Sequence, residues 1–180
     1  FFVFSLHSTH NMIHSSLLSI FFLFLLSVGQ SFASQKTWYI SPFGSDSTGD
    51  GSSSNPYATV YKAYGSATDG DVIQAASGNY GGSANLITIQ KNITIQSEKG
   101  PSSTIFTAQN SKAQFYLPNA HSVSFIGIQV SFSTSAAIQI SGPDVKIQNC
   151  IISYNQAGIA FNGGSLLVDS TTVHDNNQGI

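Results

Sequence analysis

The side chains that could carry out acid–base chemistry are few, and the best candidates lie near the C-terminal end of the chain. Lys146 is the best candidate for a base, and a repeat in which Val145 aligns with Leu166 places it near Asp169. A lysine and a carboxylate on neighbouring repeats could act as base and acid. A solvated surface pair contributes at most about 1 kcal/mol to stability. We favour the surface interpretation and keep Lys146 and Asp169 as catalytic candidates.

Two further groups have reactive side chains. His174 lies beside Asp175, which could indicate acid–base chemistry, but no serine nucleophile motif accompanies them. We therefore expect a surface histidine. Cys150 is the only cysteine, so an intramolecular disulfide is excluded. We expect it to be a buried, inert thiol, with pairing to another chain as the alternative.

A loop at residues 43–54 contains the candidate metal ligands. Asp46 and Asp50 lie among glycines and serines, which invites a calcium hypothesis. The spacing does not match a helix-loop-helix calcium loop, and no glutamate closes the loop. We favour a solvated turn that is rich in hydrogen bonds from Asp side chains to the backbone, and we expect no cofactor, with calcium as the alternative.

One modification motif is present. Asn92, Ile93 and Thr94 form a sequon for N-glycosylation at Asn92. Because Ile93 and Ile95 have the alternation of a strand, the accessibility of the Asn92 side chain decides whether the sequon is used.

The elements that must position these residues come from an internal repeat. Residues 145–159 align with residues 166–180 at an offset of 21, and residues 123–133 have the same shape one copy earlier. A repeat of this length made of short strands predicts a solenoid. Asn155 and Asn176 fall at equivalent corners, so we expect their side chains to form a hydrogen-bonded ladder along the axis.

The segments between the corners predict strands. They are short apolar alternations, rich in β-branched and aromatic residues and bounded by Gly, Asn, Ser or Pro. A doubly wound sheet would need helices between its parallel strands, and a sandwich would need two-residue hairpin turns. Neither pattern is present. The prediction is an all-β, right-handed parallel β-helix with two or three strands in each turn.

The N-terminal segment predicts a secretory leader. From Met12 the chain enters an apolar stretch at residues 17–28, which has the length of a signal-peptide core and is short for a membrane span. Ser31 and Ala33 are small residues that predict cleavage after Ala33. An uncleaved anchor is the alternative, because no lysine or arginine precedes the apolar stretch.

These patterns predict three regions. Residues 1–33 are the leader, residues 34–84 are an N-terminal cap with the first strands, and residues 85–180 are turns of the solenoid. We expect the sequence to be a translated fragment whose solenoid continues beyond residue 180.

In the cap, Asn55 and Pro56 predict the start of a short helix that ends near Gly65. Tyr57, Tyr61 and Tyr64 are expected to share its packing face.

The order of motifs over residues 38–82 resembles the opening of the pectin-lyase-like β-helix superfamily. Residues 39–46 resemble its V-S-x-x-G-S-D stretch, and residues 55–63 resemble its P-x-x-T-x-x-x-A helix. Residues 70–73 and 78–80 then match G-D-x-I and G-x-Y. The resemblance implies the fold but does not select a reaction, because lyases and surface proteins share this opening.

The resemblance also implies what an enzyme would need. Enzymes of this superfamily act on acidic polysaccharides, lyases with calcium and an arginine or lysine base, hydrolases with clustered aspartates. This chain has no arginine, and its few charged residues do not align as carboxylate stacks on successive repeats. Enzymatic activity is therefore left open.

The amino-acid composition limits the classes of partner that the protein is expected to bind. Only 8% of the residues are charged and the net charge is −2, so nucleic acid binding is not expected. We predict a secreted or cell-surface module, without a membrane span after the leader, that contacts carbohydrate or a protein partner without catalysis. The alternatives are the N-terminal part of a polysaccharide lyase or hydrolase, and a structural spacer in a larger surface protein.

Overall fold

The computed structural model describes residues 34–82, 86–107, 114–118, 122–142 and 144–180. The chain divides into two compact units, residues 1–34 and 35–180, and nearly all described residues belong to the second. The predicted leader lies outside the described residues. The elements are β1 (Thr37–Ile40), α2 (Val60–Ser66), β2 (Val72–Ala75), β3 (Gly78–Gly81), β4 (Ile87–Thr88), β5 (Ile93–Ser97), β6 (Thr104–Thr107), β7 (Phe115–Leu117), β8 (Ser122–Ile126), β9 (Gln129–Ser131), β10 (Ala136–Ile140), β11 (Asp144–Gln148), β12 (Ile151–Ser153), β13 (Ala157–Phe161), β14 (Ser165–Asp169) and β15 (Thr172–His174).

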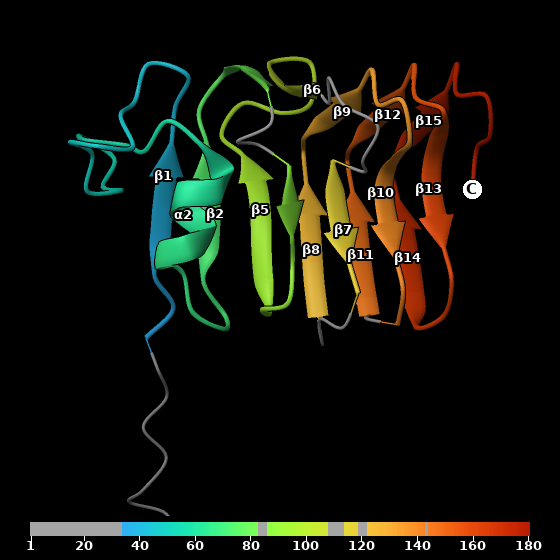
Figure 1. The fold of residues 1–180 in the computed structure, drawn as a ribbon, viewed down its shortest axis with the longest axis horizontal. Coiled ribbons are helices and arrows are strands. Elements are labelled where there is room, and N and C mark those ends of the chain that lie inside the picture. Colours follow the sequence, from blue (N-terminus) through green and yellow to red (C-terminus); the bar gives the residue numbers. More distant parts are fainter. Residues whose placement is uncertain (1–33, 83–85, 108–113, 119–121, 143) are drawn as a thin grey trace, which may run out of the picture. The chain divides into compact units, whose positions relative to one another are not determined.

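The strands form a parallel β-helix, which confirms the predicted fold class (Figure 1). Within the described residues, one sheet has six strands in the order β1-β2-β5-β8-β11-β14. A second has the order β3-β6-β9-β12-β15, and a third has the order β4-β7-β10-β13. Successive strands of the chain pass from sheet to sheet, so each sheet pairs a strand with its equivalent one turn later. Among the described residues, no helix is both long enough and apolar enough to cross a membrane.

The strand register is the one that the repeat predicts. Val145 of β11 pairs with Leu166 of β14 and with Val123 of β8. Side chains alternate along β11, where Val145 and Ile147 are buried and the residues between and after them are partly exposed. Because equivalent residues lie above one another, the inward positions of β8, β11 and β14 form apolar columns along the axis.

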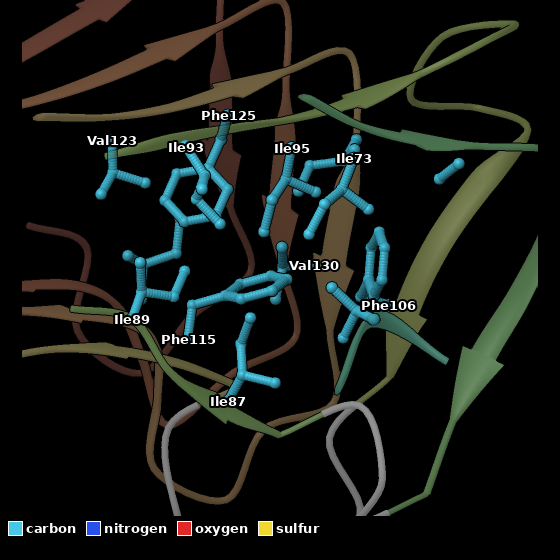
Figure 2. Close-up of a cluster of buried hydrophobic side chains, with 14 of the residues drawn as sticks. Ile73, Ile87, Ile89, Ile93, Ile95, Phe106, Phe115, Val123, Phe125 and Val130 are labelled. Carbon is cyan, nitrogen blue, oxygen red and sulfur yellow. The ribbon is translucent and has the colours of Figure 1, made fainter. Parts of the chain in front are cut away.

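Aliphatic side chains, with a column of aromatic rings among them, fill the interior between the three sheets (Figure 2). The ring centroid of Phe106 lies 4.9 Å from that of Tyr80 and 5.5 Å from that of Phe115. Phe115 in turn lies 4.9 Å from Phe125. Since fully burying an aliphatic or aromatic side chain contributes about 1.5–3 kcal/mol, this column is a major source of stability for the described turns.

The helix begins later than the sequence predicts, so the assignment of Asn55 as its N-cap is wrong. The N-cap of α2 is Thr59, whose side chain accepts a hydrogen bond from the backbone of Lys62. Asp46 holds this start in place, because its carboxylate accepts hydrogen bonds from the backbone of Ala58 and Thr59 and from the Thr59 hydroxyl. The hydrogen bonds from Asp46, which is twelve residues before Ala58, thus determine where the helix begins, in place of the local Asn55-Pro56 pattern.

The three tyrosines do not share a helix face, which corrects a second expectation. Tyr57 precedes α2 and forms a parallel bridge with Ile40, where it is buried. Tyr61 is 66% exposed, and Tyr64 is partly buried against the core. Gly65 lies within α2 and does not end it.

The end of α2 is tied to the next turn of the coil. The ammonium group of Lys91 donates hydrogen bonds of 2.8 Å to the carbonyls of Tyr64 and Ala67. The Tyr64 hydroxyl accepts from the backbone of Gln90. These contacts satisfy carbonyls at the helix C-terminus and place α2 beside the segment that follows β4.

Candidate functional site

A shallow, open groove lies at the turns that follow β9, β12 and β15. Its volume is about 360 Å³. Hydroxyl, amide and carboxylate side chains and one aromatic ring line it: Ser133, Thr134, Tyr154, Asn155, Gln156, Asp175 and Asn177. The lining residues come from three successive turns of the coil, so the groove runs along the axis of the repeat.

Three residues at these turns have the left-handed backbone conformation. The φ angles are 61° at Phe132, 58° at Tyr154 and 52° at Asp175. An aromatic residue in this region is uncommon and requires support from its surroundings. The residue follows the last strand position in each case, and the sharp turn leaves its side chain at the surface.

The two aromatic rings form an exposed stack at the edge of the groove. The ring centroids of Phe132 and Tyr154 are 5.6 Å apart and the rings are inclined by 9°. The ring of His174 meets Tyr154 edge to face at 5.9 Å. Phe132 is 59% exposed and Tyr154 is 53% exposed. We name Phe132 and Tyr154 the aromatic pair.

A buried asparagine, Asn155, fixes the turn beneath the aromatic pair. The Asn155 side chain accepts a hydrogen bond from the backbone of Ser133 and donates to the carbonyls of Val130 and Ser153. Its amide group also donates to the side-chain oxygen of Asn176 over 2.9 Å. Because these bonds fix backbone on two turns and reach a side chain on a third, they help to hold Phe132 and Tyr154 in place.

A histidine and a carboxylate meet at the end of the groove. His174 Nδ1 lies 2.7 Å from Asp175 Oδ2. The hydrogen bond from His174 lowers the pKa of Asp175, so the carboxylate is ionised at neutral pH. Ser153 is the register partner of His174. Ser153 is fully buried, however, and its Oγ has no hydrogen-bond partner among the described residues, so the geometry does not deliver a nucleophile to His174.

The predicted base and acid lie on the six-stranded sheet, away from the groove lining. Lys146 pairs in register with Leu167, and Asp169 pairs with Gln148. The Gln148 amide donates to the Asp169 carboxylate over 3.0 Å. No ion pair joins Lys146 to Asp169 in the part of the chain that the structure describes. Their catalytic assignment stays a prediction.

The predicted calcium ligands serve the loop itself. The Asp46 carboxylate is engaged at the start of α2, and Asp50 accepts a hydrogen bond from the backbone of Ser52 over 2.8 Å. Over the described ranges, no three histidine, cysteine, aspartate or glutamate side chains lie close enough to hold a metal ion together. These residues therefore do not fit the carboxylate cluster that calcium-dependent lyases need, and calcium at Asp46 and Asp50 stays an untested hypothesis.

Asn92 lies immediately before β5 and is partly exposed. Its side-chain oxygen accepts a hydrogen bond from the backbone of Ser122 over 2.9 Å. The amide nitrogen that would carry a glycan is not used in this bond, and glycosylation stays a prediction.

The aromatic pair is the part of the site that the sequence reasoning missed. The repeat aligned Tyr154 with Asp175, but it did not single out Phe132 one copy earlier. Phe132 and Tyr154 each follow a Ser that ends a short strand, at Ser131 and Ser153, which is a signal that could have found them. Their exposure could not be read from the sequence, because it depends on the left-handed turn.

Comparisons with known proteins agree with the fold. No protein-family model matches the chain, and no curated protein matches it. An alginate lyase of family PL6, AlyGC in a mutant form, is similar over 78% of this chain and 20% of its own, with 18% identity and a TM-score of 0.58. A rhamnogalacturonan lyase matches over 75% of this chain and 43% of its own, with 19% identity and a TM-score of 0.35.

This chain therefore spans a fifth of the first structure and less than half of the second. At this level of identity the likeness to the alginate lyase concerns the fold alone. The chain has the pectin-lyase-like parallel β-helix fold that its opening motifs predicted.

Proposed function

We propose that this protein is a secreted or cell-surface β-helix module that binds polysaccharide through the groove, without catalysis by the described residues. The aromatic pair at the edge of a polar groove is the observation that carries this proposal. The leader predicted at residues 12–33 and the small share of charged residues support an extracellular location. A protein partner is the alternative ligand.

The chemistry of the groove suits a sugar chain. A pyranose ring has apolar C–H faces that pack on aromatic rings, and hydroxyl groups around its rim that require donors and acceptors. Phe132 and Tyr154 expose more than half of their surface for packing. Thr134, Gln156 and Asn177 supply hydroxyl and amide groups beside them.

The shape of the groove also suits a polymer. It is open to solvent and takes its lining from three successive turns, so a polymer could lie across more than one turn of the coil. An enclosed pocket would favour a small molecule in place of a polymer.

The lyase alternative rests on fold similarity alone. The similar solved structures are an alginate lyase and a rhamnogalacturonan lyase. Within the described residues, no cluster of histidine, cysteine, aspartate or glutamate side chains is present that could hold a metal ion against a uronate carboxylate. A lyase activity would be detected as unsaturated uronate formed from alginate or pectate, assayed with and without calcium. We expect no such product from catalysis by the described residues.

Binding is tested with the full chain and a panel of immobilised polysaccharides. The variant Tyr154→Asn removes the central ring, and Asn tolerates the left-handed backbone at this position. We expect its affinity to fall about tenfold, which corresponds to about 1.4 kcal/mol. The matched control is Tyr61→Asn, because Tyr61 is also a tyrosine that exposes more than half of its surface, and it lies on α2 at the other end of the coil.

Two results would contradict the proposal. One is that the unmodified protein is retained by no polysaccharide in the panel. The other is that Tyr61→Asn lowers the affinity as much as Tyr154→Asn does, since the loss would then not belong to the groove. Thermal unfolding of both variants shows whether each is folded under the binding conditions.

A further inference from the structure

The charge of the groove distinguishes between classes of polysaccharide. Asp175 is the one charged residue among the lining side chains, and its carboxylate is 56% exposed. The other polar side chains of the lining are neutral hydroxyls and amides, from Ser133, Thr134, Asn155, Gln156 and Asn177. The lining therefore carries a negative charge and no positive one.

The described lysines all lie elsewhere. Lys36 lies over the Trp38 ring at 3.5 Å, and Lys62 and Lys91 lie over tyrosine rings of the N-terminal cap. Lys99 is 4.0 Å from Glu98. Lys146 is on β11, in the six-stranded sheet. In the part of the chain that the structure describes, no lysine lines the groove to offset Asp175.

His174 does not reverse this charge. Its Nδ1 is 2.7 Å from the Asp175 carboxylate, so a protonated imidazole would neutralise that carboxylate and leave the pair without net charge. A neutral imidazole would leave the carboxylate charge uncompensated, so in neither protonation state does the pair carry a net positive charge.

A uronate polymer carries a carboxylate on each sugar. Binding would place one of these beside Asp175 without a cation between them, and like charges at such distances repel each other. A neutral polymer presents only hydroxyl groups, which the amides and hydroxyls of the lining can pair with.

From these observations we infer that the groove selects neutral polysaccharides and discriminates against uronate polymers. This inference rests on the proposed polysaccharide binding and narrows its ligand class. It sets the ligand class of this chain apart from the substrate named for the similar alginate lyase.

The test measures affinities of the full chain for two uncharged polymers, a β-glucan and a galactomannan, and for two uronate polymers, polygalacturonate and alginate. We expect the best neutral polymer to bind at least about tenfold more tightly than either uronate polymer at low salt. Raising the salt concentration should narrow this difference, because salt screens repulsion between exposed charges.

The variant Asp175→Asn links the preference to one group. Asn is well suited to the left-handed backbone at this position, and its side-chain oxygen can still accept from His174. We expect the ratio of neutral to uronate affinity to fall by about threefold to tenfold. The matched control is Asp144→Asn, which removes an exposed carboxylate on the six-stranded sheet and should leave the ratio unchanged.

The outcomes separate this inference from the proposal beneath it. Tighter binding of a uronate polymer, or an unchanged ratio in Asp175→Asn, would overturn the inference while polysaccharide binding stands. Binding of none of the four polymers would overturn the proposed function together with the inference. Equal shifts in Asp175→Asn and Asp144→Asn would also overturn the inference, since the net charge of the protein would then be the cause.

Discussion

The side-chain amide of Asn155 donates a 2.9 Å hydrogen bond to the side-chain oxygen of Asn176, the equivalent residue one turn later. The same Asn176 oxygen accepts from the backbone of Asn155 over 3.0 Å. The Asn176 amide then donates to the carbonyl of Ile152. Two asparagines thus join three turns of the coil directly beneath the aromatic pair.

We predict that Asn155→Ala lowers the free energy of unfolding by about 2–4 kcal/mol, because it leaves buried backbone groups of Val130, Ser133 and Ser153 without their partner. Denaturant unfolding measures this loss. The matched control is Asn177→Ala, which removes an exposed asparagine whose side-chain amide donates to the side chain of Gln156. This control should lower the free energy of unfolding by less than about 0.5 kcal/mol. Equal losses in the two variants would contradict a structural role for the buried ladder.

A second prediction concerns the glycine between Trp38 and Tyr57. Gly51 has a φ of 78°, and a Cβ there would lie 2.6 Å from the Tyr57 ring and 2.7 Å from the Trp38 ring. Gly51→Ala should therefore cost about 1 kcal/mol of backbone strain and a further 1–3 kcal/mol of overpacking. The matched control is Gly163→Ala. Gly163 has a φ of 95°, and a Cβ there would meet nothing within 4 Å, so only the strain remains.

Thermal unfolding of the two glycine variants makes the comparison. A greater loss of melting temperature in Gly51→Ala assigns the difference to the packed rings. Equal losses would show that the rings move aside, and the stack of Trp38 on Tyr57 at 6.0 Å would then not be a fixed part of the cap.

The sequence predicted the parts of this fold that repeat. The offset between Val145 and Leu166 gave the register of β11 on β14, because a column of apolar residues requires one register. The alignment of Asn155 with Asn176 gave the position of the buried corner. Both features recur along the chain. A single sequence therefore contains each of them at least twice, and its copies can be aligned with one another.

The parts that failed depend on single long-range contacts. The helix α2 begins after Thr59 and not after Asn55, because the Asp46 carboxylate accepts hydrogen bonds from Ala58 and Thr59. No periodic pattern in the sequence indicates that contact. The exposure of Phe132 and Tyr154 depends on a left-handed turn fixed by Asn155. A prediction from residue types treats both rings as ordinary apolar residues of a strand.

A third prediction concerns acid stability and the carboxylate of Asp71. This side chain is buried and accepts hydrogen bonds from the backbone of Lys36 and Thr68, from the Trp38 indole and from the Thr68 hydroxyl. Burial acts to raise the pKa of Asp71, but these hydrogen bonds outweigh it and leave the pKa below the ordinary value of 3.8.

The sign of the effect follows from this lowered pKa. The native state binds the proton less well than the unfolded state, so Asp71 stabilises the fold above the ordinary pKa and this contribution is lost as the pH falls through the folded pKa. Asp71→Asn should cost about 2–4 kcal/mol at neutral pH and flatten the fall in stability below about pH 4. Denaturant unfolding across this pH range measures both effects.

The matched control for Asp71 is Asp50→Asn. The hydrogen bond from Ser52 lowers the pKa of Asp50, but this carboxylate is exposed to solvent, so its replacement should change acid stability much less. If Asp71→Asn keeps the same pH dependence as the unmodified protein, the buried carboxylate does not determine acid stability.

A fourth prediction concerns the thiol of Cys150. Burial raises the pKa of this thiol, and its sulfur donates to the carbonyls of Gln148 and Phe125 over 3.3 and 3.6 Å. Because the thiolate is the reactive form, a thiol reagent should label the folded protein at least about a hundredfold more slowly than the unfolded protein. Labelling with and without denaturant, followed by mass spectrometry, measures this ratio.

The next turn of the coil supplies the control. Thr171 occupies the equivalent position, is partly exposed, and donates to the carbonyl of Asp169 as Cys150 does to that of Gln148. Cys150→Ser should therefore fold and lose less than about 1.5 kcal/mol, because its hydroxyl can make the same bond. In that variant, Thr171→Cys should be labelled faster than native Cys150. Labelling of Cys150 as fast as the Thr171→Cys thiol would mean that this part of the core opens readily, and that Cys150 is available for pairing with another chain.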